Sequence, residues 1–259
     1  MNETVLVTGA SGGIGLELAG LFAKDGYDLV LAARSADKLE EIKRELEKRH
    51  GISVTVLPQN VSGRENVEAL WSAVEARGLT IDILVNNAGY GLYGPFAETD
   101  LTDELNMIDL NVSALTHLTK LAVRGMVSRG KGRILNVASL AAFQPGPLMA
   151  VYYATKAYVL SFSEALAHEL QGTGVTVTAL CPGATATGFE KRAKLESSRL
   201  FKMGVMDVGT VSRAGYRGLL KGKRIVVPGF KNVLMVNASR FLPRRVVTAF
   251  VRRIQGESR

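Results

Sequence analysis

The sequence predicts an α/β fold in which a seven-stranded, mostly parallel sheet lies between two layers of helices. Seven short runs are apolar and rich in β-branched residues without polar alternation, which is typical of strands buried on both faces. Amphipathic stretches of helical length separate these runs. Strict alternation of strand and helix implies right-handed crossovers, and therefore a doubly wound, three-layer arrangement.

The elements follow one another along the chain at regular intervals. The expected strands are the continuous apolar runs at residues 4–7, 29–32, 54–57, 81–85, 133–137, 175–180 and 224–227. The expected helices are the amphipathic stretches at residues 16–24, 38–49, 66–77, 102–128, 154–170 and 208–220. A left-handed glycine commonly caps a helix C-terminus, and five glycines stand at such places: Gly26, Gly51, Gly78, Gly132 and Gly174.

Composition indicates one domain, spanning residues 1–259. With 259 residues and 47% hydrophobic residues, the chain can bury a sizeable core, and no low-complexity stretch divides it. The N-terminus has no basic segment followed by an apolar core, and no run reaches transmembrane length, so we expect a cytoplasmic protein. The single cysteine, Cys181, excludes an internal disulfide, and the scattered His50, His117 and His168 offer no metal-ligand spacing.

The basic character of the chain belongs to its C-terminal part. From Lys221 onward there are ten Lys or Arg residues and one acid, Glu257, which gives +9, whereas residues 1–220 carry −1 of the total +8. This part carries no known nucleic-acid-binding motif. The charge therefore does not indicate a nucleic-acid binder.

A glycine-rich turn directly follows the first expected strand. It reads Thr8-Gly9-Ala10-Ser11-Gly12-Gly13-Ile14-Gly15 and leads into a helix. Such a turn lets the backbone approach a pyrophosphate and points the helix N-terminus at it. The position between strand and helix favours dinucleotide binding over a merely flexible turn.

The second expected strand ends in Ala33-Arg34-Ser35, where an NAD-binding protein would carry an acid for the ribose 2′-hydroxyl. An arginine at this place can pair with a 2′-phosphate. We therefore expect NADP(H), read by Arg34 and Ser11. The alternative is that Arg34 stacks on the adenine or lies in solvent.

Tyr152 and Lys156 are the best candidates for proton-transfer chemistry. Residues four apart share one helix face, so the Lys156 ammonium can lie near the Tyr152 hydroxyl, favour the phenolate and lower the tyrosine pKa toward the working range of a general acid or base. Tyr153, three residues from Lys156, shares that face as well. Spacing alone leaves both tyrosines open.

Together these motifs resemble the classical short-chain dehydrogenase/reductase family, and the resemblance runs to about residue 221. The catalytic four of the family match Asn111, Ser139, Tyr152 and Lys156. The cofactor segments of the family match Gly9, Ser11, Gly13, Ile14, Gly15, Arg34, Asn60, Val61, Asn87, Ala88, Gly89, Pro182, Gly183, Thr185 and Thr187. The resemblance implies a Rossmann-type fold, an NADP(H)-dependent oxidoreductase, a small carbonyl or alcohol substrate, and a homodimer or homotetramer.

The resemblance also implies a role for each catalytic residue. Tyr152, selected over its neighbour by the family spacing, exchanges a proton with the substrate oxygen, and Ser139 hydrogen-bonds that oxygen. Lys156 holds the nicotinamide ribose and lowers the tyrosine pKa, and Asn111 holds a water in the proton relay. The chain departs from the family at Asn60, where an aspartate commonly binds adenine. The amide oxygen of Asn60 can still accept that hydrogen bond.

Two C-terminal segments are expected to act near the substrate. By resemblance, residues 187–206 form a lid over it. In the basic extension 231–259, Pro243 opens a helix whose apolar arc contains Val246, Val247, Phe250, Val251 and Ile254. This helix either docks on the sheet or on a second subunit, or binds an anionic membrane surface.

Other functions account for fewer of these residues. A non-catalytic NADP(H)-binding regulator would not need Ser139, Tyr152 and Lys156 together. A sugar-nucleotide epimerase or dehydratase of the extended relatives is usually longer and has a differently spaced glycine turn. A membrane-associated reductase of lipid or acyl substrates remains an alternative because of the basic extension.

Overall fold

A seven-stranded sheet forms the centre of the computed structural model, which describes residues 2–188, 204–239 and 241–256. The strands are β1 (Thr4–Thr8), β2 (Asp28–Ala33), β3 (Val54–Pro58), β4 (Ile83–Asn86), β5 (Gly132–Val137), β6 (Val175–Leu180) and β7 (Ile225–Val226). Their order is β3-β2-β1-β4-β5-β6-β7, and every neighbouring pair is parallel. The predicted doubly wound sheet is confirmed, and it is parallel throughout.

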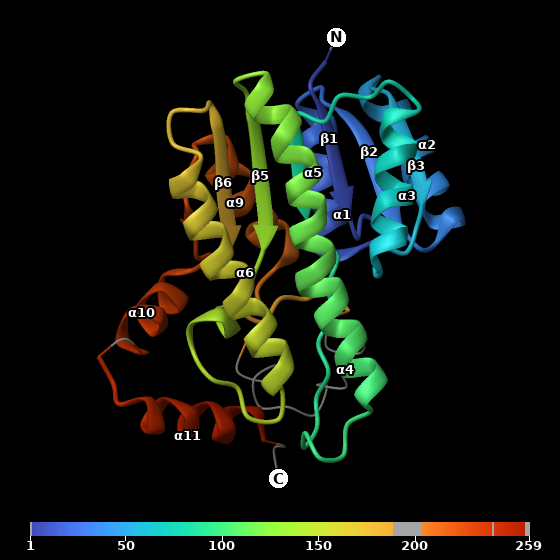
Figure 1. The fold of residues 1–259 in the computed structure, drawn as a ribbon. Coiled ribbons are helices and arrows are strands. Elements are labelled where there is room, and N and C mark those ends of the chain that lie inside the picture. Colours follow the sequence, from blue (N-terminus) through green and yellow to red (C-terminus); the bar gives the residue numbers. More distant parts are fainter. Residues whose placement is uncertain (1, 189–203, 240, 257–259) are drawn as a thin grey trace.

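Helices cover both faces of the sheet. The α-helices of the described chain are α1 (Gly13–Lys24), α2 (Ala36–His50), α3 (Arg64–Glu75), α4 (Leu101–Ile108), α5 (Leu115–Ser128), α6 (Ala150–Glu169), α9 (Val208–Leu220), α10 (Phe230–Ser239) and α11 (Arg244–Gln255), of which α10 and α11 lie beyond the ends of the strands. Figure 1 shows α3, α5 and α6 in front of the strands and α1 and α9 behind them. These are the three layers that strict alternation implies.

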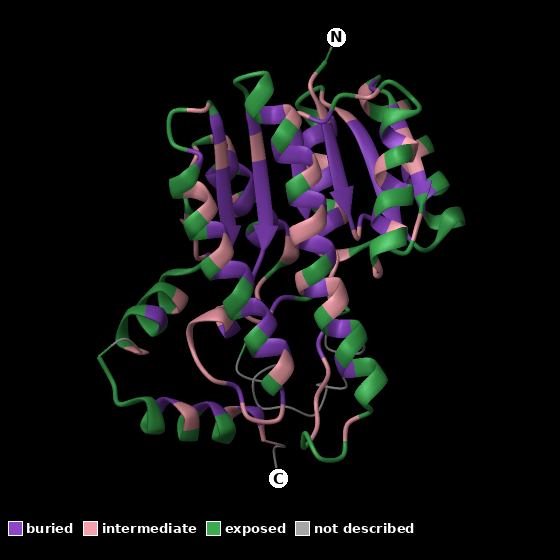
Figure 2. Cartoon of the chain, viewed as in Figure 1, coloured by how far each residue is buried: buried purple, intermediate pink, exposed green. Residues whose placement is uncertain are grey.

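The strands divide their side chains between two cores, one under each layer. Val5 and Val7 of β1 pack with α1, α2 and α9, whereas Leu6 between them packs with α3 and α5. Figure 2 shows the strands buried along almost their whole length. Burial on both faces explains why these runs carry no polar alternation.

The long helix expected at 102–128 is interrupted. A π-helical segment, Asp109–Ala114, separates α4 from α5. Such single-turn π segments are rare and are found mostly at functional sites, and no residue type in the stretch marks this one. The segment contains Asn111, which is almost completely buried.

Three of the five expected glycine caps, Gly26, Gly51 and Gly78, have a left-handed backbone just after α1, α2 and α3, with φ between 65° and 82°. Gly174 is left-handed as well, with φ 79°, but it stands directly before β6 and not at the end of α6. The prediction that Gly132 caps a helix is wrong, because this residue begins β5. Gly130, with φ 67°, follows α5 instead. A Cβ on Gly132 would lie 2.4 Å from Met126 Cγ, so close packing against α5 accounts for this glycine.

The predicted C-terminal helix is present as α11, beginning after Pro243. It does not lie on the sheet. Val247 and Val251 pack in a cluster with Met149, Tyr152 and Tyr153, beyond the carboxyl ends of the strands. The helix therefore becomes part of the region where a doubly wound fold binds its ligand.

Candidate active site

A large cavity lies at the carboxyl ends of the strands, where the strand order reverses between β1 and β4. Its volume is about 1480 Å³. It is lined by nearly all of the predicted site residues, namely Gly9, Ser11, Gly13, Ile14, Arg34, Asn60, Val61, Asn87, Ala88, Gly89, Ser139, Tyr152, Lys156, Pro182, Gly183, Thr185 and Thr187. Gly15 and Asn111 do not line it; both support residues that do.

The side chains of Asn87 and Thr8 bond the glycine turn to the end of β4. Asn87 Nδ2 donates to Thr8 O at 3.0 Å and to Gly9 O at 3.1 Å. Gly9 has φ 66°, and a Cβ on Gly15 would lie 2.4 Å from Gly9 O. Position 9 therefore requires glycine because of its left-handed backbone, and position 15 requires glycine because the turn packs closely on α1. The turn presents its backbone to the cavity, as a pyrophosphate cradle needs.

Residues at the ends of β2 and β3 form the far end of the cavity. Arg34 is exposed and lies one residue beyond β2. Asn60 Oδ1 accepts a hydrogen bond from Ser62 N at 3.3 Å, and Val61 is buried. A guanidinium beside a glycine turn suits a ribose 2′-phosphate.

The near end of the cavity holds Ser139, Tyr152 and Lys156. Ser139 follows β5, while Tyr152 and Lys156 lie on α6 and are both buried. Tyr152 is hydrogen-bonded to the Ser139 side chain. Lys156 Nζ donates to Val137 O at 2.8 Å and lies 5.8 Å from the centre of the Tyr152 ring. The three predicted side chains thus meet at one place.

Burial changes the expected electrostatics of this group. Loss of solvent raises the pKa of Tyr152 to about 12, although the hydrogen bond with Ser139 lowers it. Burial likewise lowers the pKa of Lys156 to about 8. The predicted net lowering of the tyrosine pKa is not found in the protein chain alone, because burial is the main influence on the phenol.

Asn111 links the π-helical segment to the wall of the cavity. Its Nδ2 donates to Tyr90 O at 2.9 Å and to Thr155 Oγ1 at 3.1 Å, and its Oδ1 accepts from Tyr90 N. A Cβ on Gly89 would lie 2.9 Å from Asn111 Oδ1 and 3.5 Å from Lys156 Nζ. Gly89 therefore lets Asn111 and Lys156 come close on either side of it.

The segment after β6 forms another wall. Thr185 is buried, its Oγ1 donates to Gly183 O at 2.9 Å, and it pairs with Met206 in an isolated bridge. A Cβ on Gly13 would lie 3.0 Å from Thr187 Cβ, so this segment approaches the glycine turn. Most of the lid predicted at 187–206 lies outside the described residues.

Sequence reasoning missed the contribution of the last two helices. Residues of α10 and α11 line the cavity, namely Phe230, Lys231, Asn232, Met235, Phe250, Val251, Ile254 and Gln255. Gln255 is fully buried, and its Nε2 donates to Tyr153 Oη at 2.6 Å. Spacing is the feature of the sequence that could have indicated Gln255, because it follows Val247 and Val251 at intervals of four residues. A polar residue in line with two apolar ones on a helix is easily taken for solvent-facing.

Comparison with known proteins agrees with this geometry. A family model described as short chain dehydrogenase matches residues 3–197. A putative ketoacyl reductase of Streptomyces coelicolor is 38% identical over 190 residues, covering 72% of each chain. The human very-long-chain 3-oxoacyl-CoA reductase is 34% identical, over 78% of this chain and 64% of its own length.

Solved structures show the same fold. A short-chain dehydrogenase from Sphingobium yanoikuyae in complex with NADPH superposes with a TM-score of 0.83 at 32% identity, covering 92% of this chain and 94% of its own. A short-chain dehydrogenase/reductase from Burkholderia phymatum in complex with NAD gives a TM-score of 0.82 at 25% identity, covering 91% and 92%.

The fold and the site define a nicotinamide-dependent oxidoreductase of the Rossmann type. The chain belongs to the short-chain dehydrogenase/reductase family.

Proposed function

We propose that this protein is an NADP(H)-dependent oxidoreductase that moves hydride between the nicotinamide and a carbonyl or secondary alcohol substrate. The observation that carries the proposal is one cavity with Arg34 and the glycine turn at one end and Ser139, Tyr152 and Lys156 at the other. Bound NADP(H) supplies or accepts the hydride.

The protein residues supply binding and proton transfer. Tyr152 is the general acid in reduction, because its raised pKa keeps the phenol protonated, and it is the base in the reverse direction. Ser139 hydrogen-bonds the substrate oxygen and stabilises the negative charge that develops there. Lys156 orients the nicotinamide ribose, and its charge, with that of oxidised nicotinamide, favours loss of the Tyr152 proton.

NADP(H) is preferred over NAD(H) because of Arg34. The family includes structures with either cofactor, so the choice depends on this position. The glycine turn leaves room for a pyrophosphate, and Arg34 offers the bidentate charge that a 2′-phosphate needs. Three further expectations stay predictions. They are that Asn111 holds a water in the proton relay, that the protein is cytoplasmic and that it forms a homo-oligomer.

A screen of ketones, acyl carriers, steroids and sugars for NADPH oxidation tests the proposal. We expect turnover with NADPH that exceeds turnover with NADH, and Arg34→Ala should reduce that preference by at least about tenfold, the equivalent of one charge-assisted hydrogen bond. Lys38→Ala, which removes a nearby charge already paired with Glu41, is the matched control. Preference for NADH in the unmodified protein would overturn the assignment of Arg34.

An oxoacyl compound is the second candidate for the substrate. Relatives that reduce ketoacyl and 3-oxoacyl compounds, by their names, are 33–38% identical to this chain. The cavity also has apolar lining residues beyond the tyrosines, among them Leu92, Leu140, Met149 and Ile254. The acyl-carrier arm of the screen separates this candidate from a general ketone.

A further inference from the structure

The last two helices and the link between them carry an unusual concentration of exposed apolar side chains. Of the fifteen large apolar residues that are exposed in the described chain, eight lie between residues 230 and 250. We call these eight the C-terminal apolar surface; they are Phe230, Val233, Leu234, Met235, Phe241, Leu242, Val246 and Phe250. A concentration of this kind commonly marks a surface that is covered in use.

Basic residues accompany this surface without acidic counterparts. Arg244, Arg245, Arg252 and Arg253 on α11 are exposed, and none of them forms an ion pair among the described residues. From residue 208 to residue 256 the sequence contains no Asp or Glu. The charge of this segment is therefore available to an anionic partner.

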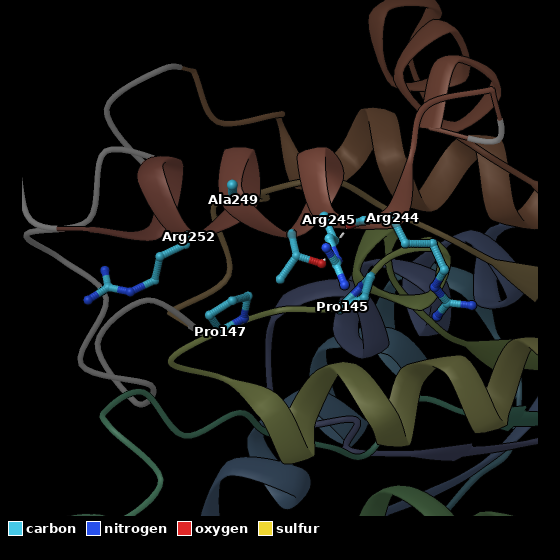
Figure 3. A pocket seen from close by; sticks show the side chains of 7 residues that line it. Pro145, Pro147, Arg244, Arg245, Ala249 and Arg252 are labelled. Atoms are coloured by element: carbon cyan, nitrogen blue, oxygen red, sulfur yellow. Dashed lines mark hydrogen bonds between the residues drawn. The ribbon is translucent and has the colours of Figure 1, made fainter.

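Three of these arginines border a groove. A space of about 470 Å³ separates this part of α11 from the loop that carries Pro145 and Pro147. Figure 3 shows Arg245 extending toward Pro145, whereas Arg244 and Arg252 extend outward on opposite sides. The lining of this groove is mainly apolar, so the arginine stems form its wall and the charged guanidinium groups lie at its rim. Guanidinium groups held at a surface in this way can pair with phosphate groups.

An anionic lipid bilayer fits both features at once. Phenylalanine and leucine side chains can enter the acyl boundary while arginines pair with lipid phosphates. A second copy of this chain would bring two segments of like charge together, which opposes pairing of this face with itself. A nucleic acid would leave the apolar side chains in water.

The same helices also border the catalytic cavity. Phe230, Met235 and Phe250 are exposed on the C-terminal apolar surface and line the cavity as well. We propose that α10 and α11 dock this protein on an anionic bilayer and that the catalytic cavity takes an amphiphilic carbonyl substrate from it. This inference deepens the proposed function and depends on it for the reaction.

Vesicle binding tests the docking. We expect the protein to co-sediment with phosphatidylglycerol-containing vesicles, more weakly at high salt, and only slightly with pure phosphatidylcholine. The variant Arg244→Gln/Arg245→Gln/Arg252→Gln should partition about 100-fold more weakly, at about fivefold per arginine near an anionic surface. None of these arginines lines the catalytic cavity.

A matched control separates local charge from total charge. Arg44→Gln/Lys48→Gln/Arg124→Gln removes three exposed charges from α2 and α5 and gives the same net charge, +5 in place of +8. This control should bind within about twofold of the unmodified protein. An equal loss in both variants, or strong binding to neutral vesicles that the arginine variant retains, would overturn the proposal.

A second variant tests the apolar contribution. Phe241→Ser/Leu242→Ser should weaken vesicle binding while NADPH binding stays unchanged, because neither residue lines the cavity. If the unmodified protein instead forms dimers that this variant dissociates, the surface is a subunit interface and the bilayer proposal is wrong. Light scattering after gel filtration gives that result directly.

Turnover distinguishes failure of the docking from failure of the reaction. With a long-chain methyl ketone dissolved in anionic vesicles, the arginine variant should be slower than the control, whereas both should reduce a water-soluble ketone from the screen equally. Equal rates on the vesicle substrate would contradict delivery from the bilayer. Absence of turnover on every soluble ketone, with vesicle binding intact, would contradict the proposed function instead.

Deletion of α11 would not isolate its contact with a bilayer. Removing the residues after Leu242 would take away Val247 and Val251 from the cluster that contains Tyr152 and Tyr153. It would also leave the Tyr153 hydroxyl without Gln255. Loss of the helix would therefore disturb the catalytic cavity along with any membrane contact.

Discussion

Two adjacent tyrosines on α6 have different hydrogen-bond partners. Tyr152 is bonded to Ser139, whereas Tyr153 accepts from Gln255 at 2.6 Å. We expect Tyr152→Phe to lower kcat by about 10²–10⁴, the usual contribution of general acid catalysis. Tyr153→Phe should keep a measurable rate and lose about 1 kcal/mol of stability with its hydrogen bond. Steady-state kinetics and urea unfolding of both variants check this, and the reverse pattern of rates would exchange their roles.

Lys156 makes stability depend on pH. Its pKa falls from 10.5 in the unfolded chain to about 8 in the folded protein because of burial. Between these values the unfolded chain binds more protons, so the free energy of unfolding should rise with pH, by up to about 1.4 kcal/mol per unit from this group.

Comparison with Lys156→Met isolates that contribution, since other groups titrate in the same range. Cys181, for example, has its pKa raised by burial, which lowers stability as the pH increases above 9. We expect the unmodified protein to gain stability relative to Lys156→Met between pH 8 and about 9.5, followed by urea denaturation. Parallel pH profiles would show that Lys156 is not titrating there.

At the scale of the element, α1 shows how a turn and a helix depend on one glycine. A Cβ on Gly15 would lie 2.4 Å from Gly9 O and 2.5 Å from Asn87 Nδ2. Gly15→Ala should therefore push the turn away from β4 and weaken both NADPH binding and stability, the latter by about 1–3 kcal/mol. Calorimetric titration and thermal unfolding measure the two effects.

Gly20, in the same helix, is the matched control. A Cβ at that position meets nothing within 4 Å, so Gly20→Ala should stabilise the protein by up to about 1 kcal/mol through helix propensity. NADPH affinity should not change. Equal losses in both variants would mean that α1 tolerates no added methyl group, rather than that the turn needs Gly15.

The elements differ in how far their sequence determines them. The strands were predictable because both faces are buried, and the glycine turn because its backbone conformation demands glycine. The π-helical segment was not predictable, because π turns are rare and no residue type marks them. The pKa of Tyr152 was not either, because spacing along α6 gives the distance to Lys156 but not the loss of water around both groups.

For the whole molecule, binding and folding are coupled through the cavity. Residues that line it are far apart in the sequence, from Gly9 in the first turn to Gln255 in α11. NADPH at about 100 times its Kd should therefore raise the free energy of unfolding by about 2.7 kcal/mol. Thermal unfolding with equal concentrations of NADPH and NADH should give the larger shift with NADPH, and equal shifts would contradict the preference for the 2′-phosphate.

The whole-molecule features that sequence could not supply depend on contacts between distant segments. The catalytic side chains were found from motifs, since each keeps a fixed place relative to a strand or helix. Gln255 and Phe250 were not, because the position of α11 depends on packing against α6 and the loop after β5. A helical wheel shows which face of a helix is apolar, but it does not show which element will pack against that face.

The hydrogen bonds of Asn87 imply an order of assembly for a newly synthesised chain. They join the first glycine turn to a residue 78 and 79 positions later. The turn can bond to Ala32 O of β2 early, but it gains the bonds to Asn87 only when β4 pairs with β1. That contact has a high sequence separation and forms slowly because a long loop must close first. Affinity for the nucleotide should consequently emerge only after the centre of the sheet has been assembled, although the glycines themselves are among the first residues synthesised.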